Sequence, residues 1–190
     1  METIFINSDN LNTDDLQEEV TRVKALVINS NDEILLGYSN GTYQFLGGHM
    51  EDNESFDAAI NREVKEESGI ELGICNVVPF LLRKSYIKNY LNSGKNRCNK
   101  IYYFAVRTDE NVNLNNTNYT DDELKGNFCV KKVALKDVKR TIVDNNIYSK
   151  YKDIAYEMLD ALNVYFKKSE KDVDKCIMEW YIRISLDDKC

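Results

Sequence analysis

The chain has 190 residues, of which 43% are hydrophobic, and a formal net charge of −7 at neutral pH. This length and apolar share are enough for one globular domain with a core of its own. The acidic balance disfavours non-specific binding to a nucleic-acid backbone. His49 is the only histidine, which excludes a zinc site built from several histidines and argues against a Ser-His-Asp triad.

The sequence carries no signal for a membrane or for secretion. No apolar run approaches the roughly 18 residues of a membrane span. The first seven residues lack a basic stretch followed by an apolar one, so no signal peptide is expected. Five cysteines are scattered without a CxxC pair, so we expect neither a disulfide framework nor a zinc site. A reducing cytoplasm is the expected setting.

The first quarter of the chain is typical of short strands separated by turns. Four strands are expected, over residues 2–7, 22–29, 33–38 and 43–46. The acidic stretch 8–20 is expected to be a loop or a short helix over residues 14–20. The polar turn at 30–32 predicts that the third strand pairs back on the second as a hairpin. The fourth strand leads to Gly47 and Gly48, where glycine permits close approach of the backbone to a ligand.

The stretch 48–70 is expected to form a loop, a helix and a residue that ends the helix. Asp52 or Asn53 can cap the helix at its start. Gly69 suits the position just past a helix, where a left-handed backbone is favoured. The helix is therefore predicted to run from residue 54 or 55 to Ser68.

One face of this helix combines apolar side chains with carboxylates. At about 100° per residue, the side chains expected to face inward are those of Phe56, Ala59, Ile60, Glu63, Val64, Glu66 and Glu67. Those expected to face solvent are Asp57, Asn61, Lys65 and Ser68. The three inward glutamates repel one another and lie at the negative end of the helix dipole. A run of charged residues on a helix usually faces solvent. Here a hard divalent cation would offset the cost of placing these acids inward.

The same stretch resembles the box of the Nudix family, Gly-x5-Glu-x7-Arg-Glu-U-x-Glu-Glu-x-Gly-U, in which U is apolar. Every specified position is filled, by Gly48, Glu54, Arg62, Glu63, Val64, Glu66, Glu67, Gly69 and Ile70. A chance match somewhere in the chain is on the order of one in ten million. The resemblance implies the Nudix fold, an α/β (α+β) arrangement with a mixed central sheet between helices. It also implies hydrolysis of a nucleoside diphosphate linked to another group.

The resemblance further implies roles for individual residues of the box. Glu63 and Glu67 would be the main ligands of Mg²⁺ or Mn²⁺, and Glu66 would be a further ligand or a base. The carbonyl near Gly48 would help to hold the metal. The remaining pair, Arg62 and Glu54, would orient the box.

A basic and tyrosine-rich zone follows the box. We expect one or two strands over residues 75–90, a loop over 92–100 and a strand over 101–107. Arg83 or Lys84 could hold phosphate, and Tyr86 or Tyr103 could stack on a base. The alternative is that these side chains only pack within strands.

The rest of the chain is expected to hold a long acidic loop over 109–125 and a last strand over 128–135. Three helices are expected, over 136–145, 148–167 and 173–184. In the resembled family an acidic residue beyond the box often acts as general base or extra metal ligand. Glu123, or Asp122 beside it, is the candidate here, and a solvated loop acid is the alternative. We expect a hydrolase domain over 1–168 and a helical extension over 169–190, which could pack on the domain or form a homodimer contact.

Three functions remain open at this point. Metal-dependent hydrolysis of a small nucleotide diphosphate derivative is favoured. A module that binds a nucleotide or ADP-ribose without hydrolysis is the alternative, although pure binding gives no reason for three crowded carboxylates. An isomerase of isoprenoid diphosphates finds no support in a chain with one histidine and no well-placed cysteine.

Overall fold

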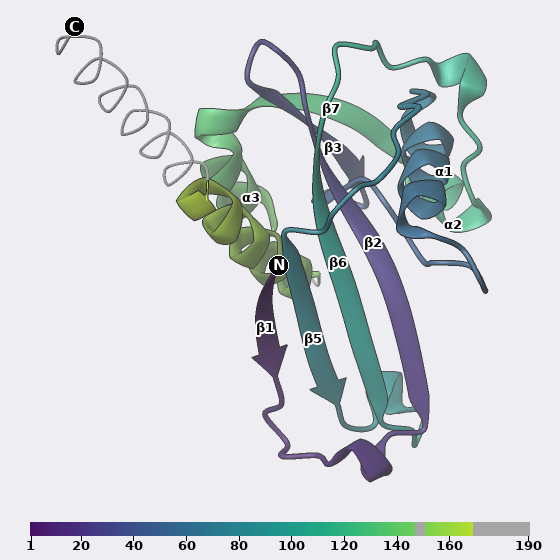
Figure 1. The fold of residues 1–190 in the computed structure, drawn as a ribbon, viewed down its shortest axis with the longest axis vertical. Coiled ribbons are helices and arrows are strands. Elements are labelled where there is room, and N and C mark those ends of the chain that lie inside the picture. The colour runs from purple at the N-terminus through teal and green to yellow at the C-terminus, as the bar shows by residue number, and fades with distance from the viewer. Residues whose placement is uncertain (147–150, 169–190) are drawn as a thin grey trace, which may run out of the picture.

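The structure is a computed structural model that describes residues 1–146 and 151–168. The predicted extension over 169–190, with its apolar stretch 173–184, lies outside the described residues, so the division of the chain stays a prediction. Within the described part, a mixed sheet has helices on both faces (Figure 1). The predicted fold class is therefore confirmed.

The described residues form one seven-stranded sheet. Its strands are β1 (Glu2–Ile6), β2 (Glu18–Ile28), β3 (Glu33–Ser39), β4 (Thr42–Phe45), β5 (Leu81–Ile87), β6 (Arg97–Arg107) and β7 (Cys129–Ala134). The order is β1-β5-β6-β2-β3-β4, and β7 pairs with β3. The β1/β5 and β2/β6 pairs are parallel and the other pairs are antiparallel.

The β2 and β6 strands both begin earlier than predicted. They pair in register from Glu18 and Arg97 to their last residues. Ion pairs between the two strands hold the added ends together, with Glu18 Oε2 2.7 Å from Arg97 Nη2 and Glu19 Oε1 2.6 Å from Lys100 Nζ. Of the two alternatives for residues 8–20, a loop or a short helix over 14–20, the loop is present up to Gln17 with a 3-10 turn at Thr13–Asp15, and β2 takes the place of the last three residues.

The helices with named bounds are α1 (Phe56–Ser68), α2 (Asp121–Lys125) and α3 (Val138–Asn146). A further helix covers residues 152–168. The α2 helix lies inside the loop predicted over 109–125, which also holds a 3-10 turn at Leu114–Asn116. No helix in residues 1–146 and 151–168 is long and apolar enough to cross a membrane.

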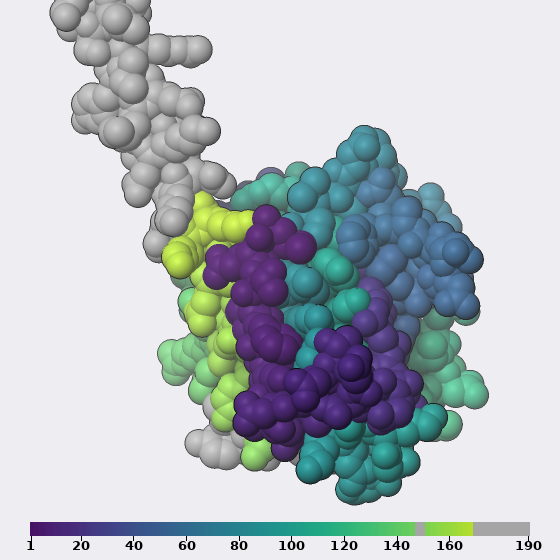
Figure 2. All heavy atoms as spheres, turned by 60° about the horizontal axis from the view of Figure 1, so that its bottom comes forward, coloured from purple at the N-terminus to yellow at the C-terminus, as the bar shows by residue number. Residues whose placement is uncertain are grey.

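The sheet separates two apolar cores. Val23 and Ala25 of β2 pack with Ile60 of α1 on one face. Leu26 of β2 packs with Ile142 of α3, and with the helix over 152–168, on the other face. The strand is thus buried on both faces, which explains its nearly continuous apolar run. The box segment (blue) and the helix over 152–168 (yellow-green) accordingly lie on opposite sides of the molecule (Figure 2).

The chain that follows β4 leaves β3 and runs along β2. The Ala25 N–H donates to the Leu46 carbonyl at 2.8 Å, and the Val23 N–H donates to the Gly48 carbonyl at 3.0 Å. Gly47 has a φ of 125°, and a Cβ there would collide with the Val23 carbonyl oxygen. Glycine is therefore required at 47, and this crossing places the start of the box between β2 and α1.

Candidate active site

The α1 helix begins and ends at defined caps. Ser55 is the N-cap, and its hydroxyl accepts a backbone N–H of the first turn at 3.2 Å. The predicted cap at Asp52 or Asn53 is wrong, because Asn53 has a φ of 63° and belongs to the preceding turn. Gly69 ends the helix as predicted, with a φ of 71°.

Two carboxylates of the box are buried on the inward face of α1. Glu63 is 9% exposed and Glu67 is 4% exposed. Glu66 is only partly buried, with 34% of its side chain exposed. The helical period predicts an inward placement for all three acids. This is confirmed for Glu63 and Glu67, whereas Glu66 lies at the edge of the buried face.

The opposite face of α1 is less exposed than predicted. Ser68 is fully buried, and its carbonyl accepts the Asn113 N–H at 2.9 Å. Asn61 donates to the Ile74 carbonyl at 2.8 Å. The chain that leaves the helix therefore folds back over this face, and of the four residues expected in solvent Lys65 is the exposed one.

Glu67 is tied to the glycine crossing. Its Oε2 accepts the Gly47 N–H at 2.7 Å. Burial, with smaller contributions from the charges of Glu123 and Glu63, raises the pKa of Glu67 to about 8, against the lowering effect of the Lys24 ammonium. The Lys24 ammonium donates to the Phe45 carbonyl at 3.0 Å and also to the Gly47 carbonyl. Burial likewise raises the pKa of Glu63 above its ordinary value of 4.5.

Arg62 connects several carboxylates of the box. Its guanidinium makes two bonds to Glu54, at 2.8 and 2.9 Å, so the predicted pair is present. Nη1 of Arg62 lies 2.8 Å from Glu63 Oε1 and 3.2 Å from Glu66 Oε2. The hydrogen bond from Arg62 lowers the pKa of Glu54, and these acids raise the pKa of Arg62 in return.

Glu63, Glu66 and Glu67 line a pocket of about 500 Å³, which we call the acid pocket. Glu123 from α2 lines the same pocket, so the structure brings this predicted residue to the box from far along the chain. Oε2 of Glu123 accepts the Thr120 N–H at 2.7 Å, which fixes the start of α2. The Asn118 N–H donates to the Glu66 carbonyl at 2.8 Å and anchors the loop to α1.

The donor set of the acid pocket fits a hard divalent cation. Carboxylate and carbonyl oxygens are the ligands that Mg²⁺ prefers. A Cβ at Gly48 would lie 2.5 Å from Glu63 Oε2, so glycine is needed for the backbone to lie this close to the carboxylate. Within residues 1–146 and 151–168, no three Asp, Glu, His or Cys side chains converge as a finished metal centre. Arg62 contacts one oxygen each of Glu63 and Glu66 in this arrangement.

A family model described as the NUDIX domain matches residues 19–150, which is most of the chain. The chain belongs to the Nudix family. Solved structures similar to it include a MutT protein from Bacillus halodurans, with 21% identity, 64% of this chain and 72% of that chain covered, and a TM-score of 0.49. The E. coli ORF135 protein shows 18% identity, 75% and 90% coverage, and a TM-score of 0.47. No curated protein matches the chain.

Two of the residues predicted to bind substrate face away from the Nudix box. Arg83 lies 2.9 Å from Glu157 Oε1 and 3.1 Å from Asp160 Oδ2, both on the helix over 152–168. Tyr103 is 1% exposed and packs edge-on against Phe45 in the core of that face. Tyr103 nevertheless lines a cavity on that face of the sheet, so its role in stacking on a base stays a prediction.

The other two predicted substrate residues lie toward the β1 edge of the sheet. Lys84 Nζ is 5.0 Å from the ring centroid of Tyr86 and 5.8 Å from that of Phe5. Neither residue lines the acid pocket. Lys84 and Tyr86 were candidates because they lie close to the box in the sequence. In the sheet, however, β6 lies between their strand, β5, and β2, which borders the box.

Lys24 is the functional candidate that the sequence reasoning missed. Its charge acts on Glu63 and Glu67, and its ammonium holds the carbonyl of Gly47. The available signal was a lysine within the apolar run 23–28. A charge in a strand that is buried on both faces requires a partner.

A second cavity, the sheet cleft, borders the acid pocket. It has a volume of about 280 Å³ and shares Gly48 and His49 with the acid pocket. Arg22 and Lys24 supply positive charge to its wall, and Phe45 supplies an apolar surface. The cleft opens on the sheet face opposite α1.

Proposed function

We propose that the chain is a metal-dependent hydrolase of a nucleoside diphosphate linked to another group. The observation that carries the proposal is the joint burial of Glu63 and Glu67 beside Gly48 in a Nudix domain. Buried acids of like charge with raised pKa values lower the stability of a fold at neutral pH. A bound divalent cation would compensate for that cost, and such acids are typical of functional sites.

Glu63, Glu66 and Glu67 would hold Mg²⁺ or Mn²⁺, with backbone oxygen near Gly48. When bound, the metal supplies Lewis-acid stabilisation of charge on the phosphoryl oxygens and makes a bound water more acidic. Arg62 orients the carboxylates through its two bonds to Glu54.

Glu123 is the candidate for moving a proton. Its Oε2 accepts both the N–H and the hydroxyl of Thr120, at 2.7 and 2.9 Å. This leaves Oε1 as the atom that would accept a proton from an attacking water. Because Glu123 reaches the acid pocket from α2 while the box acids reach it from α1, the base and the metal ligands come from different elements.

The sheet cleft would hold the nucleoside. Its polar and apolar lining is typical of small-molecule sites. Arg22 and Lys24 at its wall would balance the charge of the diphosphate next to the acid pocket.

The test is a screen of nucleoside diphosphate derivatives with Mg²⁺ and with Mn²⁺, with products identified by mass. Release of a nucleoside monophosphate is expected. Glu67→Gln should lower kcat/KM by roughly a thousandfold, which corresponds to several kcal/mol of transition-state stabilisation. The matched control is Lys65→Ala on the exposed side of the same helix, which should keep full activity.

Two outcomes would overturn the proposal. One is full turnover by a folded Glu67→Gln protein. The other is tight nucleotide binding by calorimetry without hydrolysis of any derivative, which would favour the non-hydrolysing alternative.

A further inference from the structure

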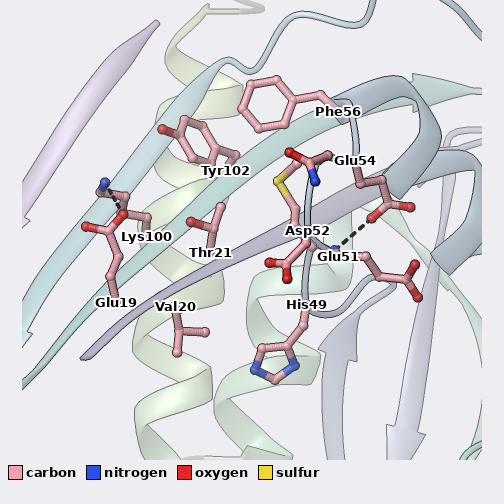
Figure 3. Close-up of a pocket in the computed structure, with 12 residues that line it drawn as sticks. Glu19, Val20, Thr21, His49, Glu51, Asp52, Glu54, Phe56, Lys100 and Tyr102 are labelled. Carbon is pink, nitrogen blue, oxygen red and sulfur yellow. Dashed lines mark hydrogen bonds and ion pairs between the residues drawn. The ribbon is translucent and has the colours of Figure 1, made fainter. Parts of the chain in front are cut away.

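A third cavity, the loop pocket, lies beside the box on the α1 face of the sheet. Its volume is about 520 Å³. Residues 49–56 form one wall, and the early ends of β2 and β6 form the other (Figure 3). The Met50 N–H donates to the Thr21 carbonyl at 3.0 Å and fixes the two walls together. The unpredicted extension of β2 and β6 therefore builds half of this pocket.

The loop pocket borders the acid pocket. His49, Met50 and Glu51 line both of them, and His49 also lines the sheet cleft. A diphosphate at the box acids has two substituents. If one substituent is the nucleoside in the sheet cleft, the other has the loop pocket as its neighbouring space.

The charges of the loop pocket disfavour a second anion. Glu19 is neutralised by Lys100 at 2.6 Å. Glu51 and Asp52 are exposed at the rim, and Glu51 comes only within 3.9 Å of Arg62. A further phosphate in this pocket would be repelled.

The polar groups at the rim of the loop pocket would pair with hydrogen-bond donors on a ligand. Ionised carboxylates only accept hydrogen bonds, so Glu51 and Asp52 select a ligand that carries hydroxyl groups. The floor is apolar, with the rings of Phe56 and Tyr102 at a centroid distance of 4.6 Å. In Figure 3 both rings lie at one end of the pocket, with Thr21 next to Tyr102, and Asp52 lies farther from the rings, toward His49. An apolar floor with a few polar groups around it is typical of a small-molecule site.

We propose that the loop pocket binds a sugar, the hydroxyl-bearing and uncharged group on the far side of the diphosphate. This rests on the proposed function, and it deepens it: the substrate class is a nucleoside diphosphate sugar rather than a nucleoside triphosphate. The C–H face of the sugar packs on Phe56 and Tyr102, and its hydroxyls donate to the rim carboxylates.

The test compares matched substrates that share a nucleoside, UDP-glucose against UTP and ADP-ribose against ATP. We expect kcat/KM for the sugar member of at least one pair to exceed that of its triphosphate by about tenfold or more. Asp52→Lys should reverse part of this preference, by about tenfold in the ratio, because it replaces repulsion of the terminal phosphate by attraction. Tyr102→Ala should raise KM for the sugar substrate several-fold more than KM for the triphosphate.

A binding measurement provides a readout besides activity. In the Glu67→Gln background, Tyr102→Ala should weaken calorimetric binding of the preferred sugar nucleotide several-fold, and exposed Lys65→Ala should not. Since Tyr102 is partly buried, the surface variant Asp52→Lys keeps the test decisive if Tyr102→Ala does not fold.

The outcomes separate the two proposals. Hydrolysis in which triphosphates are preferred, with ratios unchanged by Asp52→Lys, would overturn the sugar pocket and leave the hydrolase intact. Hydrolysis of no nucleotide would overturn both.

Discussion

Two arginine–carboxylate clusters lie on opposite faces of the same sheet. On the α1 face, Arg62 has four carboxylates within 4 Å, those of Glu51, Glu54, Glu63 and Glu66, and buried Glu67 lies in the same pocket. On the other face, Arg83 has two partners, Glu157 and Asp160. The first cluster holds a large excess of acid, whereas the second is nearly balanced.

The comparison distinguishes the proposed metal site from an ion-pair cluster that joins two elements of the fold. Burial raises the pKa of Glu157 as well as that of Glu63, so a raised pKa does not by itself mark an active site. The Arg83 cluster ties the helix over 152–168 to β5 and leaves little charge uncompensated. The Arg62 cluster gathers more carboxylates than one arginine can pair with, and a divalent cation would compensate for that excess.

The largest expected effect is a loss of stability of the metal-free protein as the pH rises. The folded-state pKa of Glu67 is raised from 4.5 to about 8, so the folded protein binds a proton that the unfolded chain has released. Stability is therefore full below the unfolded pKa and falls as the pH rises through the folded one, by on the order of 4 kcal/mol. Chemical denaturation in a chelating buffer, from about pH 5.5 to about pH 8.5, measures this slope.

Glu67→Gln isolates this effect. The lowered pKa of His49 gives a slope of the opposite sign, but it is present in both proteins. The variant should therefore be more stable than the wild type at high pH, and equal slopes in the two proteins would contradict the assignment.

Gly48→Ala should separate activity from stability. Its Cβ would meet the far end of the Glu63 side chain at 2.5 Å, which is flexible enough to shift. We expect activity to fall by about a hundredfold and the unfolding free energy to change by less than about 1 kcal/mol. At Gly47 the clash is with backbone, so Gly47→Ala should destabilise the fold itself. Unchanged activity in Gly48→Ala would show that the position of the Glu63 carboxylate does not matter.

Arg83→Met should lower stability. It leaves Glu157 without its partner, and since 27% of that side chain is exposed, we expect a loss of about 2 kcal/mol. The double variant with Glu157→Gln should recover most of the loss. Because Glu157 also lines the sheet cleft, the readout of this test is stability and not activity. Arg140→Met is the control, because this arginine is 85% exposed in its pair with Asp144 and should cost less than about 0.5 kcal/mol.

Lys24→Met has the smallest expected effect. The Lys24 charge lowers the pKa of Glu67, so its removal should raise that pKa further and extend the pH-dependent loss of stability to higher pH. Activity near neutral pH should fall by about tenfold or less. An unchanged pH profile would mean that Lys24 acts only through its bonds to the backbone.

The sequence by itself determined the parts of this protein that depend on local pattern. The helical period placed Glu63 and Glu67 inward, and the glycine at 69 ended α1. Strand periodicity located most strands to within about four residues, although the span 75–90 holds only the shorter strand Leu81–Ile87. These features follow from the geometry of a single helix or strand, so they need no knowledge of what lies across the fold.

Only the tertiary structure decided which distant residues meet. Strand order turned Arg83 and Tyr103 away from the box, brought Glu123 to it, and set the Lys24 ammonium on the Gly47 carbonyl. The parallel pairing of β2 with β6 also created the loop pocket. Each of these contacts depends on which face and which neighbour a strand acquires in the sheet, and that choice is set by the packing of the whole chain rather than by the residues nearby in sequence.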